Sequence, residues 1–219
     1  MAKLKWDQTG ERLYETGIKQ GVLYPMVDGA YPVGVPWNGL SAVTESPSGA
    51  ESTPVYADDT KYLNLLSVEE FGATVEAYTY PPEFDACLGY AELGEGIAIG
   101  QQARQVFGMS YKTTVGNDVK GNAYGYKLHL IYGASAAPSE RNYQTINDSP
   151  EAISMSFELT TTPVTVTGKE PTASLTIDST KTKASVLKAL EDALYGTEEK
   201  EAYLPLPDEI VAMIAAAAQ

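Results

Sequence analysis

The chain has 219 residues, enough to bury a sizeable hydrophobic core, and no composition break or long linker divides it into separate domains. Lys and Arg number 15 against 29 Asp and Glu, and the net charge of -14 argues against a protein that binds nucleic acid by neutralising phosphates. A single cysteine, Cys87, excludes an intramolecular disulfide and a thiolate metal cluster, and no apolar run approaches the ~20 residues of a membrane span. We therefore expect one domain over residues 1–219 that folds inside the cell, carries no signal peptide and needs no cofactor.

The first elements in chain order are an arm and a hairpin. Residues 1–20 carry mixed charge and turn-forming pairs, which predicts an extended N-terminal arm without a core of its own. Short β-like pieces follow at 22–25 and 33–37, separated by the strong turn dipeptide Asp28-Gly29. These two pieces predict the first hairpin.

The composition changes between residues 44 and 60. This segment is rich in Ser, Pro, Gly, Glu and Asp and shows no apolar periodicity. In a compact domain, an unstructured loop of that length is usually functional or disordered. We predict a projecting loop.

A long strand is predicted next, from Leu63 to Tyr80, with a bulge around Glu69-Glu70. Side chains alternate across a pleat, so the part from residue 71 onward has one apolar and one polar face. The double proline after Tyr80 removes two backbone donors and ends the strand. Such a strand suits a sheet that meets water, or another copy of the same protein, on its second side. The apolar face carries Phe71, Ala73, Val75, Ala77 and Thr79, and the polar face carries Thr74, Glu76, Tyr78 and Tyr80.

Glycines are dense between residues 89 and 100, after a short stretch of helical potential near Asp85. Neither Gly-Lys-Ser/Thr nor a GxGxxG motif leading into a helix accompanies them. They are therefore interpreted as turn residues rather than as a phosphate-binding loop. Cys87, in the helical stretch, is interpreted as a small half-buried thiol.

Period-2 alternation predicts most of the remaining elements. Two runs flank a turn at 116–118 and indicate a hairpin or a pair of neighbouring strands. A third run, beginning at Ile153, has the cleanest alternation in the chain. The predicted strands cover residues 107–115, 124–132, 153–160, 164–167 and 175–177.

His129 is the only histidine, so a histidine-based metal site or a Ser/His/Asp triad would depend on this residue alone. It lies between Lys127 and Ile131 on the more polar side of its predicted strand. The simpler interpretation is a strand histidine without catalytic or metal-binding function.

The period changes after residue 180, where an apolar stripe predicts an amphipathic helix that must lie on a sheet. Thr180 or Thr182 could cap this helix and Gly196 could end it. The C-terminal tail, about 197–219, contains a proline followed by two carboxylates, and we expect a short final helix through Ile214. The predicted fold is therefore mainly β with a flanking helix, an α+β arrangement with antiparallel strands. The helical stripe consists of Val186, Leu187, Leu190, Ala193 and Leu194.

Several stretches, in order over nearly the whole chain, resemble a known family. They are similar to the major tail protein, the tail tube subunit, of long-tailed, non-contractile bacteriophages (siphophages) of Gram-positive hosts. None of them is a chemical motif, so the resemblance rests on their number and order. The stretches are ERLYETGIKQGVLYP (11–25), EEFGATVEAYTYPPEF (69–84), FGMSYKTTVGND (107–118), GYKLHLIYG (125–133), YQTINDSPEAISMSFELTTTPV (143–164) and LPLPDEI (204–210).

The resemblance implies a β-sandwich or split barrel of the phage tail tube type, with a C-terminal amphipathic helix. It implies that subunits form hexameric rings, which stack into a hollow tube through which the phage DNA passes without specific binding. Partners implied in the same way are the tape measure protein and the tail terminator. The resemblance places assembly in the cytoplasm of the host bacterium and the product in the virion. We expect this chain to lack the immunoglobulin-like decoration of some family members.

This picture makes two groups of residues candidates for assembly. Fifteen tyrosines against four phenylalanines also favour interfaces, because Tyr combines apolar area with a polar tip. An acidic channel wall would avoid holding DNA, so polar residues of the long strands are candidates for the lumen. Candidates for contacts between subunits are Glu45, Glu51, Asp58, Asp59, Phe71, Tyr78 and Tyr80, and candidates for the lumen are Glu70, Thr74, Glu76 and Thr114.

Three alternatives compete with the tail tube. An enzyme is not favoured, because the carboxylate doublets Asp58-Asp59 and Glu69-Glu70 would point to opposite faces of a strand and would not meet at one substrate. A ligand-binding β-barrel could have similar strand patterns. The tube protein of a contractile secretion machine shares the implied fold but not the stretches of sequence quoted above.

Overall fold

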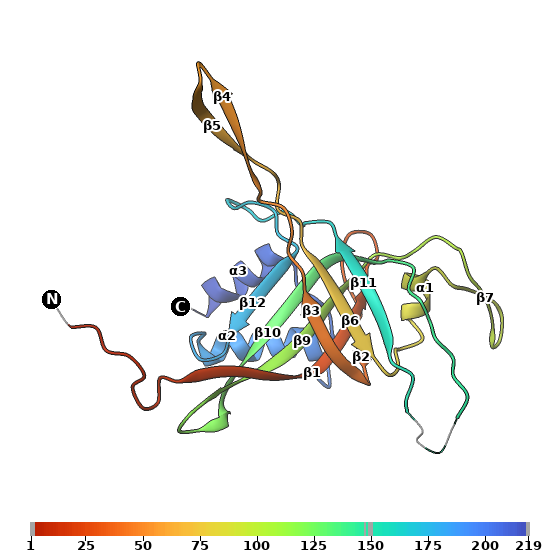
Figure 1. The fold of residues 1–219 in the computed structure, drawn as a ribbon. Helices are drawn as coiled ribbons and strands as arrows, with labels where there is room; N and C mark the ends of the chain where they lie inside the picture. The colour runs from red at the N-terminus through yellow and green to blue at the C-terminus, as the bar shows by residue number, and fades with distance from the viewer. Residues whose placement is uncertain (1–2, 147, 149–150, 218–219) are drawn as a thin grey trace.

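An antiparallel β-sheet with the two C-terminal helices against one of its faces forms the body of the protein (Figure 1). The computed structural model describes residues 3–146, 148 and 151–217. The predicted class, mainly β with antiparallel strands and a C-terminal amphipathic helix, is confirmed. The strands are β1 (Leu13–Pro25), β2 (Val35–Trp37), β3 (Leu40–Glu45), β4 (Ser52–Ala57), β5 (Thr60–Leu66), β6 (Gly72–Ala77), β7 (Ala91–Gly94), β8 (Ile97–Ile99), β9 (Phe107–Asn117), β10 (Gly121–Ala136), β11 (Met155–Thr161) and β12 (Ser174–Asp178), and the helices are α1 (Phe84–Leu88), α2 (Ala184–Tyr195) and α3 (Pro207–Ala216).

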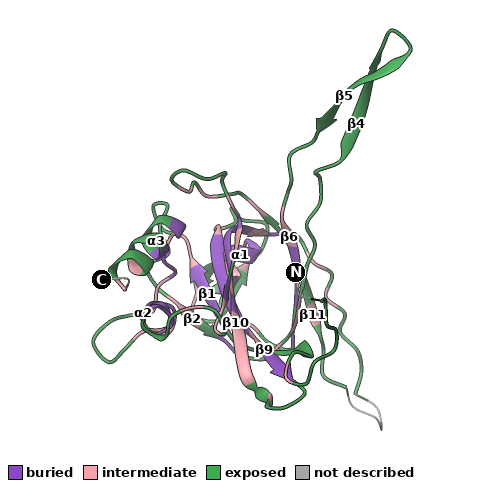
Figure 2. Ribbon diagram, turned by 90° about the vertical axis from the view of Figure 1, so that its left-hand side faces the viewer, coloured by how far each residue is buried: buried purple, intermediate pink, exposed green. Residues whose placement is uncertain are grey.

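The main sheet has the strand order β2-β1-β9-β10-β11-β6-β3, and β12 pairs with β10 beside β11. β10 is long enough to pair with β12 through residues 127–131 and with β11 through residues 134–136. Between these two regions, a register shift after Ile131 and a left-handed Gly133 mark a bulge in β10. The sheet therefore divides at β10 and curves, and β11, β6 and β3 fold over the inner side of β1 and β9 (Figure 2).

Aromatic side chains fill the space inside the curved sheet. The ring of Phe84 from α1 lies with its centroid 4.6 Å from Trp37, 5.2 Å from Phe157 and 5.3 Å from Phe107. Edge-to-face contacts of this kind stabilise a core beyond the area that they bury. The short helix predicted near Asp85 thus exists as α1, and it positions Phe84 in this cluster.

The strands β1, β9 and β10 bury side chains on both faces, since the inner core covers one face and α2 and α3 cover the other. Every residue of the predicted helical stripe is buried in α2. Tyr24 and Tyr132 lie on the helix side, and their hydroxyls donate to the carbonyls of Leu194 (2.8 Å) and Pro205 (2.9 Å). Burial raises the pKa of both tyrosines well above the ordinary value, so both remain protonated donors.

Three predicted boundaries in the first half of the chain were wrong. Residues 13–20 are not part of an arm, because they form the first half of β1 and pair with β9. The projecting segment at 44–60 is not an unstructured loop but begins with the end of β3 and continues into the β4–β5 hairpin. The predicted long strand 63–80 is two strands, β5 and β6, which belong to different sheets.

Smaller differences concern turns and caps. Gly116 and Asn117 belong to β9, and the turn to β10 follows them. The segment 164–167 makes only an isolated bridge to Thr172 instead of a strand. The residue that precedes α2 is Lys183, whose side chain makes no capping hydrogen bond, so neither predicted threonine caps the helix.

Candidate assembly interface

The β4–β5 hairpin stands off the body of the protein as a sheet of its own (Figures 1 and 2). All of its residues are exposed, although many of them are apolar or aromatic. An isolated two-stranded hairpin is only marginally stable in water, and an apolar patch on a free surface usually marks a site of interaction. The hairpin therefore has the properties of a surface that another molecule covers. Its large exposed apolar side chains, with Val68 at its base, are Val55, Tyr56, Tyr62, Leu63, Leu65 and Leu66.

The tip of this hairpin is a two-residue turn. Asp58 and Asp59 have φ values of 49° and 60°, both in the left-handed region that twisted hairpin turns require. The Thr60 hydroxyl donates to Ala57 O (3.1 Å) and closes the turn. The two carboxylates are therefore exposed turn residues rather than strand residues, which corrects the geometry assumed from the sequence.

The base of the hairpin is tied to the main sheet. Ser48 and Glu70 form an isolated bridge with backbone hydrogen bonds of 2.8 Å in both directions. At Gly49, whose φ is 85°, an added Cβ would lie 2.2 Å from Val68 O, so only glycine fits between the two chain segments. Glu51 lies just beyond, where its backbone N–H donates to Ser67 Oγ (3.0 Å). Glu70 and Glu51 are thus exposed residues at the foot of the hairpin.

A second candidate surface is the outer face of β11, β6 and β3, here called the acidic face. Thr74 pairs with Thr44 on one side and Glu158 on the other, and Glu76 pairs with Ser156. None of the three strands contains Lys or Arg. Two of the four lumen candidates, Thr74 and Glu76, therefore share one acidic surface.

Thr114 lies elsewhere. It follows Lys112 on the helix side of β9, and the ammonium group of Lys112 is 2.7 Å from Glu191 Oε1 of α2 and 4.2 Å from the Tyr126 ring centre. Residues two apart in a strand share a face, so Thr114 points to the helix side and not toward the acidic face. The four lumen candidates consequently occupy three places: the hairpin base, the acidic face and the helix side of β9.

The aromatic interface candidates also differ in exposure. Phe71 is half-buried and packs against the inner core. Tyr80 packs against Phe84 (5.7 Å between ring centres), and its hydroxyl accepts a hydrogen bond from Arg141 Nη2 (2.9 Å). Only Tyr78, with 57% of its surface exposed, remains open to a partner.

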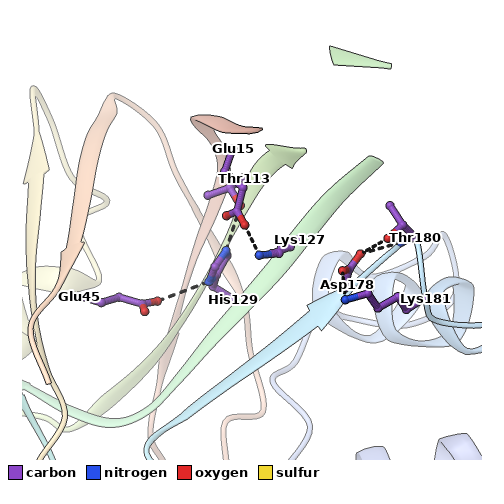
Figure 3. A network of polar contacts seen from close by, with 8 residues as sticks. All are labelled: Glu15, Glu45, Thr113, Lys127, His129, Asp178, Thr180 and Lys181. Carbon is purple, nitrogen blue, oxygen red and sulfur yellow. Dashed lines mark hydrogen bonds and ion pairs between the residues drawn. The ribbon is translucent and has the colours of Figure 1, made fainter. Parts of the chain in front are cut away.

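Glu45 points inward at the mouth of the curved sheet and is engaged by its own chain (Figure 3). The Tyr111 hydroxyl donates to Glu45 Oε1 (2.5 Å), and His129 Nδ1 lies 3.4 Å from the same oxygen. The contact with His129, followed by the hydrogen bond from Tyr111, holds the pKa of Glu45 below its ordinary value despite partial burial. The His129 ring stacks on Tyr111 at 4.7 Å, and its Nε2 lies 3.0 Å from Thr113 Oγ1.

His129 is thus a half-buried strand histidine with protein partners. In the part of the chain that the structure describes, no three His, Cys, Asp or Glu side chains come together as metal ligands would. Within the same residues, no helix is long and apolar enough to cross a membrane.

The sequence did not identify the apolar residues of the hairpin as candidates. The predicted strand 63–80 includes Leu63, Leu65 and Leu66, and the predicted loop 44–60 includes Val55 and Tyr56. The signal that could have found them is the pair of short β-like runs around Asp58-Asp59, a turn between two strands of similar length.

Comparisons with known proteins find only distant likeness. No family model and no curated protein sequence matches this chain. A chain from "Cryo-EM structure of the anti-feeding prophage (AFP) baseplate, 6-fold symmetrised" is similar over 82% of this chain and 100% of that chain, with 10% identity and a TM-score of 0.39. A chain from "Cryo-EM Structure of an Extracellular Contractile Injection System, PVC sheath-tube complex in extended state" is similar over 73% of this chain and 88% of that chain, with 12% identity and a TM-score of 0.32.

Proposed function

We propose that this protein is a structural subunit that assembles with copies of itself into stacked hexameric rings, the hollow tail tube of a long-tailed, non-contractile bacteriophage. The resemblance of the six sequence stretches motivates the ring and the tube. The observation that supports self-assembly is the β4–β5 hairpin, which stands away from the body of the protein (Figure 2) and carries exposed apolar side chains.

The physical argument concerns the free energy of the exposed hairpin. Burying apolar surface contributes roughly 25 cal/mol per Å², so six large side chains covered by a neighbour would stabilise the hairpin and the assembly together. A monomer that kept this surface in water would expose a strand pair with unpaired edges, which favours association. We expect the hairpin to be buried against an adjacent subunit or ring in the tube.

The acidic face is proposed as the wall of the channel. Its strands carry Glu76 and Glu158 and no basic residue, and each subunit has a formal charge of -14. A basic wall would bind phosphates with an affinity that rises with each counterion released, whereas an acidic wall repels them. This repulsion fades over about 8 Å at physiological salt, so DNA would be kept from the wall and would move freely along the axis.

The observed geometry favours this function over a ligand-binding barrel or an enzyme. Phe84, Phe107 and Phe157 fill the inside of the curved sheet, where a lipocalin-like protein would hold its ligand. The carboxylates of Asp58 and Asp59 are at an exposed turn, away from any enclosed site. We propose a non-enzymatic protein whose partners are its own copies and, by resemblance, the tape measure protein and the tail terminator.

Excision of the hairpin tests the proposal. Ser67 N–H donates to Glu51 O (3.0 Å), so residues 52–66 can be replaced by Asn-Gly between Glu51 and Ser67 without stretching the chain. The excised subunit should fold but form no tubes, as measured by circular dichroism, sedimentation velocity and negative-stain microscopy. Normal tubes from this variant would remove the hairpin from the assembly, and an unaltered protein that stays monomeric at every concentration would contradict self-assembly itself.

The tube of a contractile machine is the second candidate, and it predicts the same rings of this protein. The two differ in whether a contractile sheath surrounds the tube. Negative-stain images of intact particles that contain this chain would separate them, since a bare flexible tail supports the siphophage tube and a sheathed tail supports the contractile machine.

A further inference from the structure

A groove opens on the helix side of the protein, between β12, α2, α3 and the segment that precedes β12. It has a volume of about 450 Å³, in the range of sites that hold several side chains or a small ligand. Val211 and Ile214 of α3 lie at its rim and are more than half exposed, although they face other apolar groups. Its apolar lining consists mainly of Leu175, Ile177, Val186, Leu190, Ile210 and Ile214.

One wall of the groove is a free strand edge. β12 pairs with β10 along one side, and no strand of the described residues pairs with its other side. Tyr132 N–H donates to Ala173 O (2.8 Å), and Ser179 N–H donates to Tyr126 O (3.0 Å). The pairs 132/173 and 126/179 at the two ends of the β10–β12 ladder are therefore hydrogen-bonded pairs. Because bonded and non-bonded pairs alternate in an antiparallel ladder, Thr176 directs its N–H and C=O away from β10. An extended segment laid in the groove could therefore add a strand to β12 while its side chains fill the apolar lining.

A segment with the required pattern lies outside the fold. Residues 3–12 contain no strand or helix, and Figure 1 shows this arm leaving the body beyond the start of β1. Leu4 and Trp6 are each 72% exposed. In an extended conformation these two side chains share one side, while Lys3 and Lys5 share the other. The arm thus offers an apolar side that would enter a groove and a basic side that would remain in water.

Charge complementarity favours the arm as the occupant of the groove. The groove lining includes Glu170 and Asp178 against a single base, Lys169. The arm begins with Lys3 and Lys5 on a protein whose overall charge is -14, so basic arms are attracted to acidic neighbours. An arm that extends away from its own body can reach a neighbouring subunit.

We propose that the N-terminal arm of one subunit docks in the β12–α3 groove of another, with Leu4 and Trp6 in the groove and the arm backbone paired to the edge of β12. The proposal rests on the proposed self-assembly and identifies one contact within it. The contact explains why the apolar rim of α3 and the tryptophan of the arm are both left exposed in the single subunit.

Disulfide trapping between two differently tagged chains tests the contact directly. One chain carries Leu4→Cys and the other carries Val211→Cys, and the mixture is oxidised under assembly conditions. The native Cys87 will not interfere, because it is fully buried and burial raises the pKa of its thiol to about 12. The matched control replaces Val211→Cys by Val119→Cys, a residue of similar exposure at the β9–β10 turn.

We expect the Leu4–Val211 pair to form a mixed-tag dimer several-fold more efficiently than the control pair. Equal yields from the two pairs would overturn the proposal. A chain carrying both L4C and V211C that closes an internal disulfide at high dilution would also overturn it, because the arm would then occupy its own groove.

Tryptophan fluorescence provides an independent readout. Trp37 is buried in the single subunit, so any gain in protection from acrylamide quenching upon assembly belongs to Trp6. We expect this gain in the unaltered protein and in Val119→Asp, and its loss in Ile214→Asp, which introduces a charge at the groove rim. Tubes that form while Trp6 stays fully quenchable would refute the arm contact and leave self-assembly intact, whereas the absence of rings and tubes in sedimentation would refute both.

Discussion

Glu45 illustrates how the position of one carboxylate decides its role. It lies at the end of β3, the strand that directly precedes the hairpin, and would be an acidic surface residue if its side chain turned outward. Instead it contacts His129 (Figure 3) and accepts a hydrogen bond from Tyr111, so it connects β3 to β9 and β10 across the mouth of the sheet. This contact fixes the strand from which the hairpin leaves.

The lowered pKa of Glu45 predicts a pH dependence of stability. A carboxyl whose pKa is depressed in the folded state contributes stability above its unfolded value near 4.5, and the contribution is lost as pH falls through the lower folded value. Glu45→Gln should reduce the free energy of unfolding by about 1 kcal/mol at pH 7, a modest effect because the carboxylate is partly exposed to solvent.

Urea unfolding of dilute subunits at pH 7 and at pH 3 would measure the effect. The difference between E45Q and the unaltered protein should shrink at the lower pH. Glu51→Gln, at the exposed foot of the hairpin, is the matched control and should change the free energy of unfolding at neither pH. An equal loss for E45Q at both pH values would show that the charge of Glu45 contributes nothing.

At the scale of elements, the spacing of apolar residues correctly predicted those helices and strands in which the apolar side chains are the buried ones. The α2 stripe is buried as a unit because its spacing matches a helix, and Ala73, Val75 and Ala77 are buried on β6 as the alternation required. The strands β9 and β10 were also predicted, although both of their faces are covered and a strand buried on both faces shows little alternation of apolar and polar residues.

The sequence could not place elements whose pairing or burial depends on contacts with distant parts of the chain. β5 and β6 appear as one continuous β-like run in the sequence, and the break between them coincides with the bridge between Ser48 and Glu70, a contact with another segment of the chain. The inward turn of Glu45 depends on Tyr111 and His129, which follow 66 or more residues later in the chain. Likewise, strand alternation cannot tell which polar face meets the helices, so Thr114 was grouped with Thr74 and Glu76.

The turn of the hairpin offers a prediction for this element alone. Asp58 and Asp59 both hold left-handed backbone conformations, which glycine and asparagine adopt at lower cost. The double variant D58N/D59G should stabilise the hairpin by roughly 0.5–1 kcal/mol. Amide hydrogen exchange in β4 and β5 of the monomer should slow several-fold, while exchange in β9 and β10 stays the same. Unchanged exchange in the hairpin would mean that its order does not depend on this turn.

Tyr78 offers a prediction for the end of β6. Because its side chain is exposed, Tyr78→Asp should change the free energy of unfolding by less than about 0.5 kcal/mol. If the face of β6 meets a neighbour, the same change should raise the concentration needed for ring formation at least several-fold, as measured by sedimentation velocity. Parallel losses of stability and assembly would instead make Tyr78 a residue of the core. Thr79→Asp, also exposed at the same strand end, controls for added charge.

At the scale of the whole molecule, the acidic face predicts how tubes treat DNA. Purified tubes should not retain double-stranded DNA even at low salt. The variant E76K/E158K should retain it, and added salt should release it, since each lysine that neutralises a phosphate releases about one counterion. Glu199→Lys/Glu201→Lys, in the exposed segment after α2, is the control with the same change in net charge. Retention by the control alone would place the channel wall on the helix side.

The pairing of β1 with β9 has a consequence for synthesis on the ribosome. The Gly10 N–H donates to the carboxylate of Asp118, which lies 108 residues later in the chain, so this end of the pair can close only after that stretch has been made. β9 and β10, in contrast, are joined by a short turn and can zip together as soon as they emerge. We expect the β9–β10 hairpin to form the template on which β1 docks late, so nascent chains would expose the apolar end of β1 for much of translation.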